Sequence, residues 1–152
     1  MTTIPDRIEK KILLRAPKAR VWRALADTKE FGTWFGAKLT GEFSPGAKVS
    51  GPITTKGYEH LTLTVTVERM EKERLLAFRW IPDDVDPKAD MSNEPTTLVE
   101  FHLEESKEGT LLTVVESGFD NVPLARRAKA FESNSQGWAE QLTNIERHVA
   151  QG

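Results

Sequence analysis

The strictest pattern in this sequence is a seven-residue alternation that begins at residue 61. The apolar residues Leu61, Leu63, Val65 and Val67 are separated from one another by threonines. A period of two residues is typical of a β-strand that buries one face, and the β-branched threonines favour a strand as well. The pattern therefore predicts a half-buried antiparallel strand, so the chain must contain a sheet with one covered face.

Further strands are expected on both sides of this one. Turn residues at Ser44–Gly46, at 54–57 and at Glu108–Gly109 separate the apolar runs, because Pro and Gly favour reversals of the chain. The sequence predicts about seven antiparallel strands, of which residues 61–70 form one. The others lie at 7–15, 37–43, 48–53 and 75–80, around Val99–Leu103 and around Leu112–Val114.

Three helices are expected to accompany the sheet. Pro17 suits the start of a first helix, which has apolar residues at helical spacing as far as Ala26. Asp27 or Thr28 caps a second short helix, which ends at Gly36. The third, from Pro123 to Gln151 and capped by Asp120 or Asn121, has a long apolar stripe. Its expected members are Leu124, Ala128, Phe131, Ser135, Trp138, Leu142, Ile145 and Val149.

Length and composition exclude several classes of protein. The chain has 152 residues, which fits one domain, and no Cys, which rules out disulfide scaffolds, thiol nucleophiles and cysteine zinc sites. Its longest strictly apolar run is Leu75–Phe78, far short of the roughly 20 residues of a membrane span. The first residues lack the apolar stretch of a signal peptide. We therefore expect a single cytoplasmic domain that does not enter a membrane.

The formal net charge of -2 hides an uneven distribution. Residues 81–121 carry 11 acidic and two basic side chains, whereas residues 1–80 have a basic excess spread over strands and helices. No concentrated basic stripe is present, so nucleic-acid binding is not expected. Residues 82–95 form a polar loop with Asp83, Asp84, Asp86 and Asp90, which lacks the Gly turn and the spacing of a calcium loop. If this loop lies over a binding site, it disfavours anionic ligands.

Six strings occur in a characteristic order along the chain. They are PKARVWRAL (17–25), FGTWF (31–35), Pro45–Gly46, RLLAFRW (74–80), GTLLTVVESGF (109–119) and GWAEQLTNIERHV (137–149). Together they resemble the START-like, helix-grip superfamily, which is also called SRPBCC or Bet v 1-like, and most of all its branch of homologues of the activator of the heat-shock-protein-90 ATPase. The resemblance implies an α+β helix-grip fold, in which a curved antiparallel sheet wraps around the long C-terminal helix.

The resemblance also implies a cavity between the sheet and the last helix that takes a hydrophobic or aromatic small molecule. Alternating apolar residues also fill the plain core of any sheet-and-helix protein, so both interpretations stay open. Trp34 and Phe35 are expected near the mouth of such a cavity. The other expected lining residues are Leu63, Val65, Leu76, Phe78, Trp80, Phe101, Leu112, Val114, Phe131, Trp138 and Leu142.

Glu116 is the leading polar candidate, because it continues the inward side of the strand that contains Leu112 and Val114. It could bind a ligand hydroxyl or amine or act as a general acid or base. It could also form a structural salt bridge or lie at a strand end that faces solvent. His60 and His102 are distant in sequence and are expected on the surface, and His148 is expected in solvent. No metal or cofactor site is predicted.

Three functions remain open at this stage. The first is a carrier or sensor of a hydrophobic small molecule. The second, which follows from the family resemblance, is an interaction module with a chaperone as its partner and a role in the stress response. The third is a cyclase- or aromatase-like enzyme that uses Glu116. The sequence leaves both a monomer and a homodimer open.

Overall fold

The computed structural model describes residues 6–82 and 95–151. The acidic residues Asp83, Asp84, Asp86 and Asp90, and with them most of the predicted loop 82–95, lie outside this range. The elements follow one another as β1 (Arg7–Leu14), α1 (Lys18–Ala26), α2 (Thr28–Phe35), β2 (Lys48–Pro52), β3 (Thr62–Glu71), β4 (Leu75–Trp80), β5 (Thr97–Ser106), β6 (Gly109–Ser117), the short 3-10 helix η1 (Phe119–Asn121) and α3 (Leu124–Ala150).

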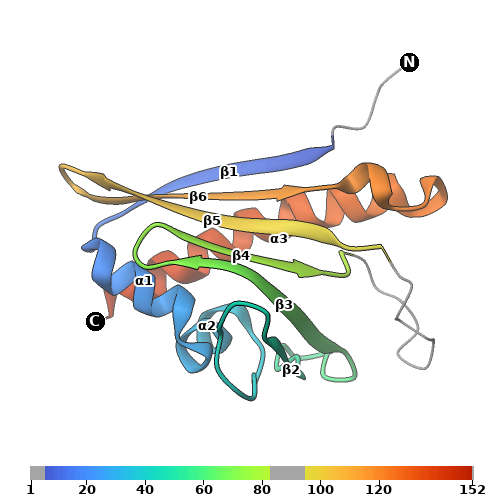
Figure 1. Cartoon of the computed structure of the whole chain (residues 1–152), viewed down its shortest axis with the longest axis horizontal. Coiled ribbons are helices and arrows are strands. Elements are labelled where there is room, and N and C mark those ends of the chain that lie inside the picture. Colours follow the sequence, from blue (N-terminus) through green and yellow to red (C-terminus); the bar gives the residue numbers. More distant parts are fainter. Residues whose placement is uncertain (1–5, 83–94, 152) are drawn as a thin grey trace.

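The strands form one antiparallel sheet in the order β1-β6-β5-β4-β3-β2. Helix α3 runs along one face of this sheet, and α1 and α2 lie near the C-terminal end of α3 (Figure 1). The α+β helix-grip architecture predicted from the sequence is therefore confirmed. Each strand pairs with its neighbour in sequence except β1, which pairs with β6 and so brings the first and last strands of the chain side by side.

The described part of the chain has six strands, because residues 37–43 do not form the predicted one. This segment makes only two isolated bridges, Ala37 with Ile53 and Thr40 with Ser50. It still covers the outer edge of β2, since the amide of Lys38 donates to Pro52 at 2.9 Å. Gly41 has a φ of 102°, which bends the chain away before a regular strand develops.

The predicted start and end of α2 are confirmed. The Asp27 carboxylate accepts hydrogen bonds from the amides of Lys29 at 2.8 Å and Glu30 at 3.3 Å, which satisfies two donors that the helix leaves unpaired. Gly36 follows the last turn with a φ of 98°, a left-handed conformation that favours glycine. The short helix therefore has well-defined ends.

Only part of the predicted apolar stripe of α3 is buried. Trp138, Leu142, Ile145 and Val149 pack into the core, whereas the side chain of Leu124 is 74% exposed. The first turn of the predicted stripe therefore lies outside the core, because helical spacing marks a face of the helix but not how far the opposite layer extends. The predicted side-chain cap of this helix by Asp120 or Asn121 is also absent.

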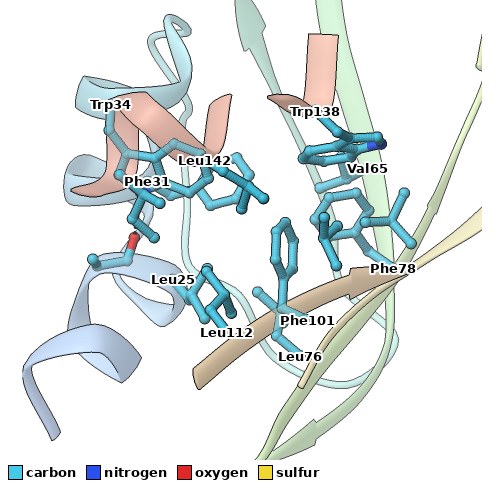
Figure 2. Packing of buried hydrophobic residues seen from close by; sticks show 14 of the residues in the cluster. Leu25, Phe31, Trp34, Val65, Leu76, Phe78, Phe101, Leu112, Trp138 and Leu142 are labelled. Carbon is cyan, nitrogen blue, oxygen red and sulfur yellow. Dashed lines mark hydrogen bonds between the residues drawn. The ribbon is translucent and has the colours of Figure 1, made fainter. Parts of the chain in front are cut away.

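The core lies between the sheet, α3 and the first two helices (Figure 2). Its largest members are aromatic, and their rings meet mainly edge to face, the arrangement that aromatic quadrupoles favour. Phe101 on β5 is fully buried at the centre. Its ring centroid lies 5.6 Å from that of Trp138 and 5.9 Å from that of Phe78, so it links α3 to the sheet.

A part-buried polar cluster joins the C-terminal end of α3 to α1 and α2. The Glu30 carboxylate accepts hydrogen bonds from Arg20 and Arg23, both at 2.8 Å, and lies 2.9 Å from His148 Nε2. His148 therefore does not lie free in solvent as expected, because its side chain is only 18% exposed. Burial opposes ionisation of Glu30, but the bonds from His148, Arg20 and Arg23 outweigh it and lower the pKa of this carboxyl.

This cluster predicts a loss of stability in acid. A lowered pKa in the folded state means that the ionised Glu30 stabilises the fold at pH values above its ordinary pKa of 4.5. The stabilisation by ionised Glu30 is lost as the pH falls from the ordinary pKa of 4.5 through the lowered pKa of the folded state. Urea unfolding of the wild type and of Glu30→Gln should therefore differ at pH 7 and converge toward pH 3. A difference that stays constant over this range would contradict the assignment.

Candidate functional site

The most unusual polar group in the described chain is the carboxylate of Glu116, which is fully buried. Oε1 accepts hydrogen bonds from Trp138 Nε1 at 2.9 Å and from Asn134 Nδ2 at 3.1 Å. Oε2 accepts from Trp80 Nε1 at 2.8 Å, from Thr97 Oγ1 at 2.5 Å and again from Asn134 Nδ2 at 3.1 Å. Two tryptophan indoles, a hydroxyl and an amide thus surround one carboxylate.

The fold brings these five residues together from four elements. The alternation of β6 turns Glu116 inward in line with Leu112 and Val114, as predicted, and Trp80 and Thr97 are directly paired across β4 and β5. On α3, Asn134 and Trp138 are four residues apart and therefore lie one turn apart on the same face. The carboxylate consequently links three neighbouring strands to the helix.

The four described groups that bind Glu116 are all neutral. No Lys, Arg or His among the described residues forms an ion pair with it, so the salt-bridge interpretation is not supported within residues 6–82 and 95–151. Burying a charge is costly unless hydrogen bonds replace its hydration, and five such bonds do so here. Because each oxygen already accepts at least two bonds, the carboxylate is held in one orientation.

An aromatic cluster lies directly beside the carboxylate. The rings of Trp80 and Trp138 are stacked, with centroids 5.5 Å apart and planes at 22°. Phe35, at the end of α2, lies 5.8 Å from Trp80 and 6.2 Å from Trp138. Trp138 is buried, whereas Phe35 and Trp80 are partly exposed, so the cluster reaches from the core to the protein surface.

The predicted lining residues occupy two different environments. Most of them are buried and pack against one another, including Trp34, whose Nε1 donates to the carbonyl of Ala24 at 2.8 Å. Leu63, Phe35 and Trp80 are partly exposed, and so is Phe131, which packs separately against Phe119 at 5.2 Å. The buried group comprises Trp34, Val65, Leu76, Phe78, Phe101, Leu112, Val114, Glu116, Trp138 and Leu142.

A pocket of about 220 Å³ lies against the N-terminal half of α3. Asn134 lines this pocket and also donates to Glu116, whereas Glu116, Trp80 and Trp138 are not among its described lining residues. Pro82, two residues after Trp80, lines the pocket from the sheet side. The remaining described lining residues are Ala125, Arg126, Lys129, Ala130 and Ser133.

Two members of this site, Thr97 and Asn134, were missed in the sequence. Thr97 begins β5 on the inward side of Val99, and Asn134 precedes Trp138 by one helical turn. The strand alternation and the four-residue helical spacing therefore indicate from the sequence that Thr97 and Asn134 share a face with predicted residues. The sequence does not show that the end of β4, the start of β5 and the end of β6 lie beside this turn of α3.

The histidines do not form a site in the described chain. His60 is exposed, and His102 lies on the outer face of the sheet with Nε2 3.8 Å from Glu100 Oε2. Within residues 6–82 and 95–151, no three His, Asp or Glu side chains form a group that could hold a metal ion. No helix in the same range is long and apolar enough to span a membrane.

Comparison with known proteins identifies the family. A family model described as "Activator of Hsp90 ATPase homolog 1-like protein" (AHSA1) matches residues 15–150. The chain belongs to the AHSA1 family. The family resemblance expected from the sequence strings is therefore confirmed over nearly the whole chain. A search of curated proteins found no match.

Solved structures share the AHSA1 fold over almost the entire chain. Protein MLL2253 from Mesorhizobium loti is 21% identical, with a TM-score of 0.76, and the match covers 95% of this chain and 97% of that one. The Aha1 dimer from Colwellia psychrerythraea is 14% identical, with a TM-score of 0.71 and coverages of 94% and 95%. DynU16, described as a putative protein in the dynemicin biosynthetic locus, is 22% identical, with a TM-score of 0.73 and coverages of 97% and 48%.

Proposed function

We propose that this AHSA1-family domain binds an apolar, aromatic small molecule beside the stacked Trp80 and Trp138, and that the ligand presents a hydrogen-bond donor toward Glu116. The observation that carries this proposal is the buried carboxylate, which has only neutral partners among the described residues. The domain would act as a carrier or sensor of its ligand.

The arrangement around Trp80 supports this position for the ligand. Phe35 and Trp80 are partly exposed beside a buried indole, so the uncovered part of their rings offers an apolar contact for a flat ring. The centre of the core is occupied by rings such as Phe78 and Phe101, which supports a ligand position at this margin of the sheet and helix rather than at the centre. We propose that the ligand enters from the side of the pocket that Asn134 lines, because Asn134 also donates to Glu116.

The bonding of Glu116 indicates how a polar ligand group would be recognised. Asn134 shares one amide between both carboxylate oxygens at 3.1 Å, which makes its bonds the longest of the five. A ligand hydroxyl that replaces this amide would keep the carboxylate satisfied. A ligand carboxylate would bring a second negative charge to a buried one, which is strongly unfavourable.

A matched pair of probes tests the proposal. We expect 2-naphthalenemethanol to change the tryptophan fluorescence and to bind more tightly than 2-naphthoate, which has the same ring system and a negative charge. Trp80→Phe should weaken binding of the alcohol, whereas Trp22→Phe, in α1, should not. Tighter binding of 2-naphthoate would refute recognition by Glu116 and would point to Arg126 and Lys129 in the pocket.

Native mass spectrometry of the protein purified from its own cells tests the same proposal without choosing a ligand. A small molecule that co-purifies with the wild type and is lost in Trp80→Phe would support a carrier. Consistent absence of any bound molecule, together with no response to either naphthalene probe, would refute it.

A chaperone-linked role is the second candidate, and the family match favours it. The chain also aligns with 95% of the Colwellia psychrerythraea Aha1 chain. This role predicts that the purified protein raises the ATPase rate of a heat-shock-protein-90 chaperone. An unchanged rate with saturating protein would refute it.

The cyclase-like alternative receives less support from the geometry. A general base must take the substrate proton onto an oxygen, and a proton there would occupy a site at which Glu116 accepts bonds from its four donors. A ligand hydroxyl in place of Asn134 would instead leave these sites in use. These bonds favour a binding role over proton transfer.

A further inference from the structure

The two edges of the sheet differ in how they are protected. The edge strand β2 is covered by the segment that follows α2, since Lys38 donates to Pro52 and Thr40 donates to Ser50 at 3.0 Å. The other edge strand, β1, pairs with β6 on one side, and no described residue pairs with its outer side. Figure 1 shows β1 as the outermost strand at its end of the sheet.

The register with β6 identifies which backbone groups of β1 point outward. The amide of Gly118 donates to the carbonyl of Asp6, so this pair is a hydrogen-bonded one, and such pairs alternate along an antiparallel ladder. Ile8, Lys10, Ile12 and Leu14 therefore bond to β6. The amides and carbonyls of Arg7, Glu9, Lys11 and Leu13 point away from the sheet.

A second copy of this chain matches this edge in one particular register. If two β1 strands pair in antiparallel orientation with Glu9 opposite Lys11 of the other copy, Arg7 lies opposite Leu13. All four outward-pointing residues of each copy then find a hydrogen-bonding partner. Shifting the register by two residues leaves one of the four unpaired and places either Glu9 opposite Glu9 or Lys11 opposite Lys11.

The side chains favour the same register. Within its own strand Glu9 binds Arg7 at 2.5 Å and lies 3.9 Å from Lys11. In the dimer, two Glu9–Lys11 pairs of opposite charge are added across the strands on the outer face, where cross-strand ion pairs stabilise and like charges destabilise. On the face toward α3, Ile8 lies opposite Ile12 of the other copy in both halves, and such β-branched pairs pack well across strands. One contact in this register is unfavourable, because Lys10 of one copy lies opposite Lys10 of the other on the two-fold axis.

We propose that two copies of this chain associate through β1 in this register and form one continuous twelve-stranded sheet. Strand pairing supplies eight backbone hydrogen bonds between the copies, and the Glu9–Lys11 pairs fix the register. Edge strands often carry lysines that prevent pairing, so the charge pattern of β1 could also protect a monomer. The reciprocal placement of Glu9 and Lys11 favours association instead. This inference does not depend on any ligand.

Charge reversal tests both the surface and the register. We expect sedimentation of the full chain to show a concentration-dependent dimer in the wild type. Glu9→Lys and Lys11→Glu should each raise the dissociation constant about tenfold or more, because each creates two like-charge pairs. An equimolar mixture of the two variants should recover the dimer, since each cross-strand pair would again join a lysine to a glutamate. Glu42→Lys, an equal charge change near β2, should leave the dissociation constant unchanged.

A backbone variant tests the hydrogen bonds themselves. Leu13→Pro removes an outward-pointing amide without removing a bond to β6, so the fold should persist in circular dichroism while the dimer weakens. Leu13→Ala is the control for loss of the side chain and should retain the dimer. A wild type that stays monomeric at all concentrations would overturn the proposal. A dimer unaffected by the charge reversals and by Leu13→Pro, or a mixture that does not recover it, would do so as well.

Discussion

Replacing Glu116 by alanine should lower the free energy of unfolding by about 3–5 kcal/mol. The substitution leaves two indole N–H groups, a threonine hydroxyl and an asparagine amide without their common acceptor. Each buried polar group that stays unsatisfied costs about 1–3 kcal/mol, and water that enters the vacated space recovers part of the sum. Urea unfolding followed by tryptophan fluorescence measures the difference.

Two further variants show whether the hydrogen bonds cause the loss. Glu116→Gln keeps the size and one acceptor oxygen but directs an amide N–H₂ toward other donors, so it should cost less than alanine and still be destabilising. Glu104→Ala, an exposed position on β5, should change stability by less than about 0.5 kcal/mol. Equal stability of the wild type and Glu116→Ala would show that the four donors do not depend on this carboxylate.

Phe101→Ala should have a similarly large effect, about 3–5 kcal/mol, for a different reason. The ring is fully buried and its centroid lies within 6.2 Å of the rings of Phe31, Phe78 and Trp138, which come from three separate elements. Its removal costs the transfer of the side chain from water and leaves a cavity that these rings fill only in part. The midpoint of urea unfolding should shift accordingly.

A neighbouring residue on the same strand provides the matched control. Leu98 is on the opposite face of β5, outside the core that contains Phe101, and is partly exposed. Leu98→Ala should therefore cost much less than Phe101→Ala. Comparable losses for the two variants would mean that the outer face of the sheet is covered by something other than solvent.

Much of the fold could be predicted because its determinants are local. The alternation around Val65 specifies a strand with one buried face, and the Asp27 cap and Gly36 define the ends of α2 through their own side chain and φ angle. The segment 37–43 could not be assigned correctly. Its apolar residues suit a strand, but whether it pairs regularly depends on the path from Gly36 past the edge of β2.

The candidate site was likewise predictable only in part. The inward direction of Glu116 follows from the alternation of β6, so the sequence alone singles out this residue. Its partners come from β4, β5 and α3, and the sequence separates Trp80 from Trp138 by more than a third of the chain. The sequence alone therefore left a salt bridge, a solvent-facing strand end, catalysis and ligand binding open for Glu116, and favoured a structural role.

The sequence by itself determined the fold class, the family and the inward face of each main strand, because periodicity and turn residues act over short distances. Only the tertiary structure decided the environment of Glu116, the partner of His148 and the exposure of Leu124. A side chain's surroundings are set by elements that meet in space, and the energy of a buried charge depends on which donors those elements bring within hydrogen-bonding distance.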